Sequence, residues 1–191
     1  MSSGSTARTY EGAEITRRLD DFIGAYEEVY SDPPYSEGPR DVADFIESYR
    51  RQARRDGARL ALAHDGDELI GFAFGFPLPS DTRWWQNVEG VALPADFTRE
   101  DGRRTFAVIE LAVRKPWRRR GVARGLHDRL LDGTGIERST LTVRPEPEAL
   151  PAQAAYRSWG YTVVGTSHPW DTAPYYTAMV RPLPGETAAR S

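Results

Sequence analysis

Residues 113–131 read VRKPWRRRGVARGLHDRLL, and this stretch decides how the rest of the chain is interpreted. Basic residues and a tryptophan stand directly before Gly121, and Val122, Leu126 and Leu130 then fall on one face of a helix. The pattern predicts a helix that opens at Gly121 after a basic turn. Because the first backbone N–H groups of a helix lack partners inside it, such a turn favours an anion.

The residues of this turn indicate a pyrophosphate as the anion. Gly121 permits close backbone approach, and Ala123 keeps the first turn of the helix uncrowded. Full positive charges surround the same point, on Arg118, Arg119, Arg120 and Arg124. Neither the dinucleotide fingerprint GxGxxG nor the P-loop GK[ST] is present. From the residues alone, a solvated basic face or a nucleic-acid patch stays open as an alternative.

Composition narrows the classes of partner. With 28 acidic against 25 basic residues, the surface as a whole should repel a phosphate backbone, so we expect no nucleic acid. Cysteine is absent and the three histidines are scattered, which argues against thiolate catalysis and against a metal site. The chain has no long apolar run and no secretory signal at its start, so we expect no membrane partner and a cytoplasmic location.

The first half of the sequence predicts two helices and a hairpin. Apolar spacing favours amphipathic helices over residues 15–29 and 41–55, separated by the proline-rich loop SDPPYSEGP. Apolar clusters on either side of Asp65-Gly66 predict an antiparallel hairpin. Residues 80–104 have no clear period and should form a long loop.

The second half alternates strands with helices. TFAVIELAV, residues 105–113, should be a central strand, interrupted only by Glu110. A helix over PAQAAYRSW should end at Gly160. The remaining strands are STLTV, YTVVGT and YYTAMV. We therefore predict one mixed α and β domain over residues 9–183, with disordered tails at 1–8 and 184–191.

Two motifs in order resemble the landmarks of the GNAT superfamily of N-acetyltransferases. RRRGVA, residues 118–123, matches the signature [RQ]-x-x-G-x-[GA] between a strand and a helix. AAYRSWGY, residues 154–161, looks like the second landmark, a Tyr followed four residues later by Gly and an aromatic residue. The resemblance implies a single α+β GNAT-like domain. Its mixed, mostly antiparallel central sheet would splay at an acetyl-CoA cleft and carry about four helices.

The resemblance also implies roles for named residues. Acetyl-CoA, as cosubstrate without a metal, would contact Leu111, Ala112, Val113, Arg118, Arg119, Arg120, Gly121, Val122, Ala123 and Arg124. Tyr156 would protonate the departing thiolate. Ala149 stands where many relatives carry an Asn that contacts the pantetheine arm.

Glu110 is the predicted general base for the acceptor amine. It interrupts an apolar strand, and partial burial should raise the pKa of its carboxyl toward the range that suits a base. The alternatives are a structural pairing of Glu110 with an arginine, and a water relay that replaces it. His127, one position past the apolar stripe of its helix, should lie on the surface.

Aromatic residues in the loops are the predicted acceptor site. They are Tyr35, Trp84, Trp85 and Tyr175. Of the two adjacent tryptophans, one should be a core residue and one should cap the acceptor pocket, and the sequence leaves open which. Acidic neighbours such as Glu37 favour a small-molecule amine, cationic or partly aromatic, as acceptor. A non-catalytic acyl-CoA sensor and a protein or peptide N-acetyltransferase are the alternatives, and a homodimer stays open.

Overall fold

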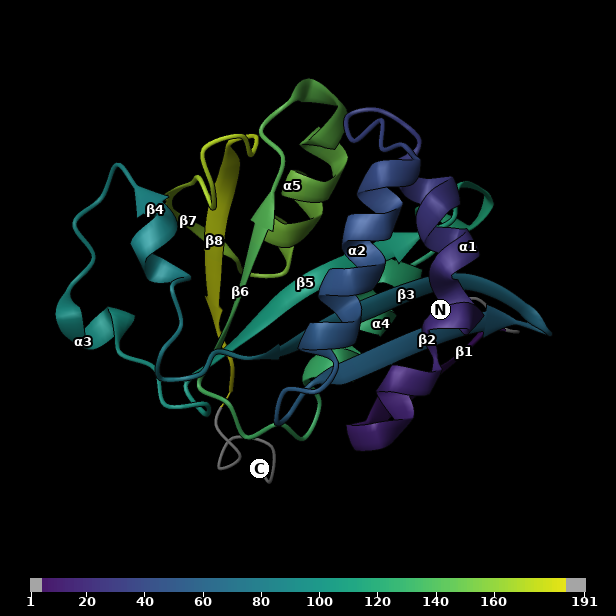
Figure 1. The fold of residues 1–191 in the computed structure, drawn as a ribbon, viewed down its shortest axis with the longest axis horizontal. Coiled ribbons are helices and arrows are strands. Elements are labelled where there is room, and N and C mark those ends of the chain that lie inside the picture. The colour runs from purple at the N-terminus through teal and green to yellow at the C-terminus, as the bar shows by residue number, and fades with distance from the viewer. Residues whose placement is uncertain (1–4, 185–191) are drawn as a thin grey trace. The chain divides into compact units, whose positions relative to one another are not determined.

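The computed structural model describes residues 5–184, and the chain forms two compact units (Figure 1). The first comprises the residues up to Phe76 and Val108–Gly133, and the second comprises Pro77–Ala107 and the residues from Thr134 onward. The described residues contain eight strands and four α-helices of nine or more residues. The predicted α+β class with about four helices is therefore confirmed.

The first unit is built on four strands that are neighbours in the order β1-β2-β3-β5. They are β1 (Ser5–Glu11), β2 (Arg59–Asp65), β3 (Glu68–Pro77) and β5 (Thr105–Val113). β1 and β2 pair antiparallel, with Ser5 opposite Asp65, and β2 and β3 form the predicted hairpin, with Gly66 in its turn. The first residues of β5, up to Ala107, belong to the second unit, and the rest of the strand belongs to this one.

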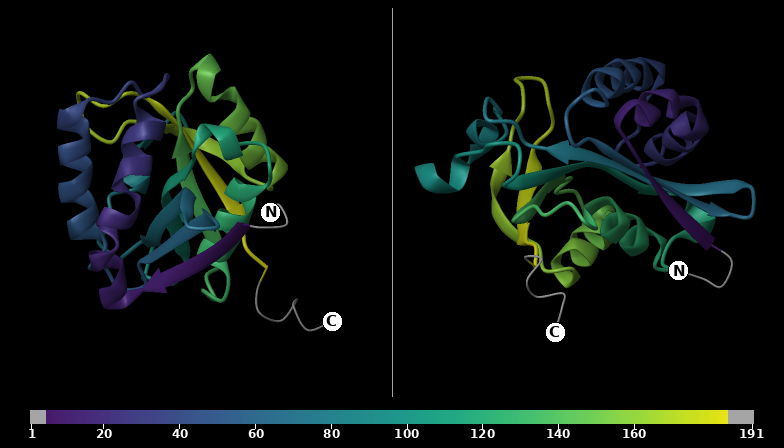
Figure 2. Two further views of the ribbon diagram at one scale, coloured as in Figure 1. Left: turned by 90° about the vertical axis from the view of Figure 1, so that its right-hand side faces the viewer. Right: turned by 90° about the horizontal axis from the view of Figure 1, so that it is seen from below.

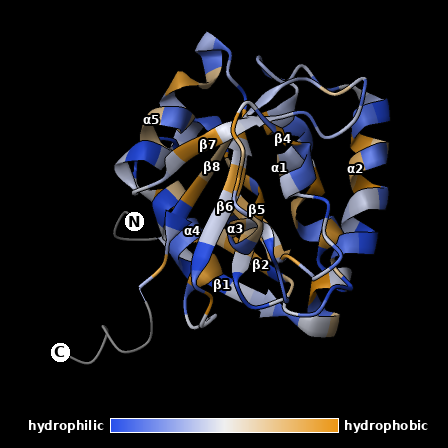
Figure 3. Ribbon diagram, turned by 90° about the vertical axis from the view of Figure 1, so that its left-hand side faces the viewer, coloured by the Kyte–Doolittle hydropathy of each residue, from blue (hydrophilic) through white to orange (hydrophobic). Residues whose placement is uncertain are grey.

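Three α-helices and two 3-10 helices complete the first unit. They are η1 (Gly12–Arg17), α1 (Leu19–Tyr30), α2 (Pro39–Gln52), η3 (Lys115–Trp117) and α4 (Val122–Leu131). α1 and α2 lie on one face of the strands and α4 lies on the other (Figure 2). On the α1 and α2 side, Phe22 packs on Phe72 with ring centroids 4.8 Å apart, and Tyr49 packs on Phe74 at 4.9 Å. α2 carries hydrophobic and hydrophilic residues around its turns (Figure 3), as its amphipathic pattern predicts.

The second unit has four complete strands in the order β6-β8-β7-β4. They are β4 (Val88–Glu89), β6 (Arg138–Val143), β7 (Thr162–Ser167) and β8 (Tyr176–Pro182), and their pairs are antiparallel. α5 (Leu150–Ser158) lies beside these strands (Figure 1) and follows the one-turn helix η4 (Pro147–Ala149). Tyr161 is buried just after α5, and its hydroxyl donates to Ser139 Oγ at 2.7 Å. This bond ties the end of α5 to β6.

The structure departs from the prediction at the start of the chain and in the long loop. Residues 5–8 lie in β1 and pair with β2, so the predicted tail over 1–8 is wrong for these four residues, whose polar side chains sit on an edge strand. Residues 1–4 and 185–191 lie outside the described residues. The predicted long loop contains η2 (Trp85–Asn87), β4 and the one-turn helix α3 (Ala95–Thr98), elements too short to give a periodic signal.

Gly71 in β3 lets α4 and β5 approach the strand closely. A Cβ atom on Gly71 would lie 2.7 Å from the backbone oxygen of Ala112 and 3.1 Å from Leu126 Cδ1. We expect Gly71→Ala to lower the free energy of unfolding in urea by about 1–3 kcal/mol, because backbone must move to admit the methyl group.

Gly24→Ala is the matched control for this prediction. Gly24 lies within α1, and a Cβ atom there would meet nothing within 4 Å. This variant should gain about 0.5–1 kcal/mol from the better helix propensity of alanine. Equal effects of the two substitutions would refute the close approach at Gly71.

Candidate active site

Glu110 is the acidic residue of an otherwise apolar strand, and β5 places its side chain beside α1. Its strand neighbours Phe106, Ala107 and Val108 are buried, whereas Glu110 is half-buried. The hydroxyl of Tyr30, at the end of α1, donates to Glu110 Oε2 at 2.5 Å. Among residues 5–184 no cation forms an ion pair with Glu110, so the alternative of an arginine partner is not observed.

The environment of Glu110 favours its neutral form. The pKa of the Glu110 carboxyl is raised to about 8, chiefly by burial, and the hydrogen bond from Tyr30 lowers it while the negative charge of Glu37 adds to the rise. A carboxyl with this pKa is poised to exchange a proton near neutral pH. This is the shift that the sequence predicted for Glu110 from partial burial.

Tyrosines and carboxylates gather around Glu110 in what we call the acid–tyrosine cluster, made of Tyr26, Tyr30, Tyr35, Glu37 and Glu110. The hydroxyl of Tyr26 donates to Glu37 Oε2 at 2.7 Å. The rings of Tyr26 and Tyr30 lie 4.4 Å apart, and Tyr35 meets Tyr30 edge-on at 4.7 Å. Tyr35 was predicted at this site, while Tyr26 and Tyr30 were not.

Both buried tyrosines of the cluster remain protonated donors. Burial, followed by the negative charge of Glu110, raises the pKa of the Tyr26 and Tyr30 hydroxyls well above its ordinary value. Burial likewise raises the pKa of Glu37. The hydrogen bond from Tyr26 opposes this rise, and the negative charge of Asp41, at the start of α2, adds to it. The spacing of Tyr26 and Tyr30, four residues apart on α1, was the sequence signal that they share a face.

The start of α4 has the geometry predicted for an anion site. Gly121 is the N-cap residue with φ 81°, in the left-handed region that glycine adopts without strain, and Arg119 before it has φ 63°. Since Gly121 has no side chain, it cannot cap the first backbone N–H groups of the helix. Left-handed residues in such a turn leave backbone N–H groups available to an anion.

The arginines around this turn differ in exposure and in their hydrogen-bond partners. Arg118, Arg119 and Arg120 are exposed, and Arg118 Nε also donates to the backbone oxygen of Val113 at 2.9 Å. Arg124 Nε donates to Asp128 Oδ2 at 2.8 Å, one turn further along α4. The donor set of exposed guanidinium groups and helix N–H groups fits the pyrophosphate of acetyl-CoA.

The strand residues before this turn are held firmly. Ala112 and Val113 are buried and Leu111 is half-buried. Arg114, which follows them, pairs with Glu28 of α1 at 2.7 Å and with Glu68 of β3 at 2.6 Å. These bonds fix the end of β5, from which the chain enters the basic turn. The predicted contacts of Leu111, Ala112 and Val113 with the donor stay predictions.

His127 lies on α4 but not on its surface. The side chain is fully buried beside Leu126, and its Nδ1 lies 3.3 Å from Asp128 Oδ1. The prediction of a surface position is wrong, because α4 packs on β1 and β2 with a wider face than its leucine stripe marks.

Tyr156 belongs to the second unit, on α5. Its ring is half-buried and meets Trp159 edge-on at 5.4 Å and Tyr161 at 5.9 Å. Its backbone oxygen accepts hydrogen bonds from the N–H groups of Trp159 and Tyr161. These bonds close the last turn of α5, and the chain leaves the helix at Gly160, which has a positive φ. The predicted helix and its end are confirmed, and the role of Tyr156 as an acid stays a prediction.

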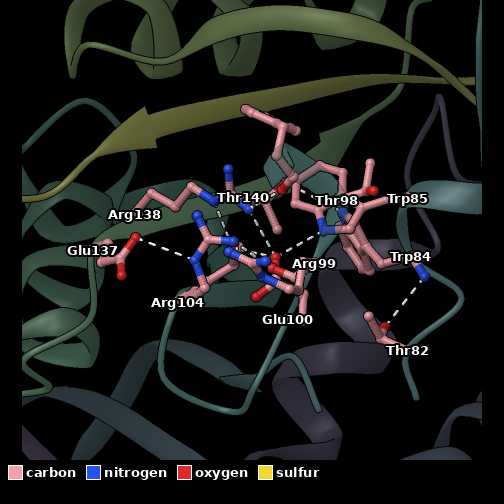
Figure 4. A network of polar contacts seen from close by, with 12 residues as sticks. Thr82, Trp84, Trp85, Thr98, Arg99, Glu100, Arg104, Glu137, Arg138 and Thr140 are labelled. Atoms are coloured by element: carbon pink, nitrogen blue, oxygen red, sulfur yellow. Dashed lines mark hydrogen bonds and ion pairs between the residues drawn. The ribbon is translucent and has the colours of Figure 1, made fainter. Parts of the chain in front are cut away.

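Trp85 is the core member of the tryptophan pair. It is 5% exposed, and its Nε1 donates to Glu100 Oε1 at 2.8 Å. Figure 4 shows the network that continues from Glu100 to Arg138, whose Nη2 donates to the same carboxylate oxygen at 2.9 Å. One tryptophan of the pair was predicted to be a core residue, and Trp85 takes that place, while a role of Trp85 in acceptor binding stays a prediction.

Trp84 and Tyr175 keep surface that a ligand could contact. Trp84 is half-buried, and its Nε1 donates to Thr140 Oγ1 at 3.3 Å (Figure 4). Tyr175 is 53% exposed and stacks on His168 with ring centroids 4.4 Å apart. Both stay predicted acceptor residues.

A family model agrees with the two sequence landmarks. The model described as the acetyltransferase (GNAT) family matches residues 19–161, which include both landmarks and parts of both units. No curated protein sequence matches the chain. No helix among residues 5–184 is both long and apolar enough to span a bilayer.

Solved structures with the same fold include three N-acetyltransferases. The ribosomal-protein-S18-alanine N-acetyltransferase of Escherichia coli is 16% identical with a TM-score of 0.60, over 95% of this chain and 97% of that one. PaiA N-acetyltransferase of Thermoplasma acidophilum, in complex with coenzyme A, is 13% identical with a TM-score of 0.57, over 93% and 99%. A spermidine N-acetyltransferase chimera from Vibrio cholerae and hSSAT is 16% identical with a TM-score of 0.57, over 94% and 96%.

Proposed function

The chain belongs to the GNAT family of acetyltransferases, and on that premise we propose that it transfers the acetyl group of acetyl-CoA directly to a primary amine of a small molecule. The observation that carries this proposal is Glu110, a half-buried carboxyl without an ionic partner among residues 5–184, whose pKa is raised to about 8. A primary ammonium must lose a proton before its nitrogen can attack a thioester, and a carboxyl of this pKa is suited to take it.

The donor half of the proposal rests on the basic turn. Acetyl-CoA supplies an activated acetyl group as a thioester. Arg118, Arg119 and Arg120 and the N–H groups at the start of α4 would hold its pyrophosphate, together with Gly121, Val122, Ala123 and Arg124. Backbone groups of Leu111, Ala112 and Val113 would hold the pantetheine arm, and one N–H among them would stabilise the oxyanion.

The proton transfers of the reaction are assigned to Glu110 and Tyr156. Glu110 takes a proton from the acceptor ammonium, so that the nitrogen lone pair can form the C–N bond with the acetyl carbon. As the C–S bond breaks, its electron pair leaves on sulfur and Tyr156 gives its hydroxyl proton to the thiolate. The second N–H proton, released as the amide forms, restores Tyr156, and Glu110 then gives the proton it took to solvent. The assignment of Tyr156 rests on its spacing to Gly160 and on the family resemblance.

The acid–tyrosine cluster favours a small cationic amine as the acceptor. Its two carboxylates, Glu37 and Glu110, accept hydrogen bonds from tyrosine hydroxyls, and no ion pair to either occurs among residues 5–184. Carboxylates and aromatic faces are the groups that attract an ammonium ion. The names of proteins with the same fold include both small-molecule and protein acetyltransferases, so acceptance of a protein or peptide amine is the alternative.

The acceptor class is tested by following free thiol release from acetyl-CoA with matched sets of amines. One set contains short diamines, aminoglycosides and arylethylamines, and the other contains peptides with a free N-terminal alanine or an internal lysine. We expect release with members of the first set, fastest above about pH 8, where Glu110 is ionised. Reaction of the peptides alone would overturn the small-molecule assignment.

A further inference from the structure

Two tyrosine–carboxylate pairs stand side by side around the proposed base. Tyr30 donates to Glu110 at 2.5 Å and Tyr26 donates to Glu37 at 2.7 Å, from residues one helical turn apart on α1. The two rings lie 4.4 Å apart with a tilt of 37°. Because both hydroxyls come from one packed helix face, the two carboxylates are held by a common support.

The support itself is rigid. Tyr26 is 4% exposed and Tyr30 is 9% exposed, and Phe45 of α2 stacks on Tyr26 at 3.8 Å. On its other side Tyr30 meets Tyr35 edge-on. A buried ring that is packed on both faces cannot move its hydroxyl without disturbing its neighbours. The position of the Tyr30 hydroxyl is therefore fixed independently of Glu110.

We propose that Tyr30 is a positioning residue that orients Glu110 and stabilises its ionised form, and that Glu37, held by Tyr26, opposes it by stabilising the neutral form. The inference rests on the proposed function in that Glu110 is taken to be the base. The titratable groups that act on Glu110 are Tyr30, Tyr26 and Glu37. Beyond them, Tyr35 lies beside Tyr30, and Asp41 at the start of α2 acts on Glu37. None of these groups is a cation, so the Tyr30 hydrogen bond is the contact that favours the ionised form of Glu110 against burial and the charge of Glu37.

The two pairs act on the charge of Glu110 in opposite directions, which gives the proposal a test. A hydrogen bond to a carboxylate favours the ionised form, so its loss in Tyr30→Phe should raise the pKa of Glu110 by about one unit. A nearby negative charge favours the neutral form, so its removal in Glu37→Gln should lower that pKa by a smaller amount. If Tyr30 and Glu37 only stabilised the fold, neither substitution would shift the pKa of Glu110.

The primary measurement is the pKa of Glu110 itself, from NMR titration of protein that carries 13Cδ-labelled glutamate, with the resonance assigned by its absence in Glu110→Gln. The second is the acid limb of the kcat/KM profile, which should follow the same shifts. At pH 7 Tyr30→Phe should show about tenfold lower kcat/KM, recovered at high pH. Shifts of the same sign in the two variants, or no shift, would overturn the proposal.

Tyr49→Phe is the matched control. Tyr49 is a buried tyrosine of the same unit, and its hydroxyl donates to the backbone oxygen of Ile15 at 2.9 Å. Its loss should lower stability and leave the Glu110 resonance in place. The titration needs no acceptor, so opposite shifts without turnover would support the positioning role while contradicting the proposed function. Turnover without a shift of the Glu110 resonance in either variant would support the proposed function and contradict the positioning role of Tyr30.

Discussion

Replacement of Glu110 by glutamine is expected to lower kcat/KM for the acceptor amine by about 10²- to 10⁴-fold, the usual contribution of a general base. The amide keeps the size of the side chain and can accept the hydrogen bond that Tyr30 donates, but it cannot take a proton from an ammonium ion. The dissociation constant for acetyl-CoA should not change. Initial rates of thiol release at saturating and limiting amine measure the effect.

The stability of Glu110→Gln provides an internal control, because the substitution should lower activity while it raises stability at high pH. The pKa of Glu110 is raised in the folded protein, so protonation of this group favours folding fully below its ordinary pKa of 4.5 and ceases to do so as pH rises through about 8. Glu110→Gln lacks this dependence. Urea unfolding should therefore show the variant gaining stability relative to the wild type as pH rises from 5 to about 9. A variant that lost both activity and stability at high pH would indicate a structural role for Glu110.

Reversal of charge at the start of α4 is the second change with a large expected effect. Arg120→Glu together with Gly121→Asp should weaken acetyl-CoA binding by at least about 100-fold, since it removes one guanidinium group and places two carboxylates beside the pyrophosphate. The aspartate must also adopt φ 81°, which glycine tolerates far better. Isothermal titration of both proteins with acetyl-CoA measures the ratio.

The control makes the same substitutions at the other end of the helix. Arg129→Glu and Gly133→Asp change the net charge equally, and Gly133 also has a positive φ of 67° with nothing within 4 Å of an added Cβ atom. Acetyl-CoA should bind this variant as it binds the wild type. Equal losses in both double variants would mean that net charge, and not the turn at Gly121, governs binding.

Elements with strong local signals could be predicted from the sequence. The helix that opens at Gly121, the hairpin with Gly66 in its turn and the helix that ends before Gly160 combine a periodic pattern with a glycine at a boundary. β1 was missed because STAR has the composition of a tail, and only its pairing with β2 makes it a strand. Such pairing is tertiary information that the local sequence lacks.

The sequence could predict the ionisable residue of the proposed site, but not the residues that hold it in place. Glu110 stood out as the acidic residue of an apolar strand, and its raised pKa follows from that setting. That Tyr30, 80 residues earlier, donates to it could not be read from any spacing. The burial of Trp85 was equally hidden, because it depends on Glu100 and Arg138 from separate segments.

The most direct test of the central claim is to incubate the wild-type protein with acetyl-CoA and the fastest amine of the panel, and to quantify free CoA thiol and N-acetylated amine together. The account predicts that the two appear in equal amounts, at a rate that depends on the amine and rises with pH through about 8. Tight binding of acetyl-CoA without acetylation of any amine would contradict it and would identify the chain as a family member that binds the donor without transferring its acetyl group.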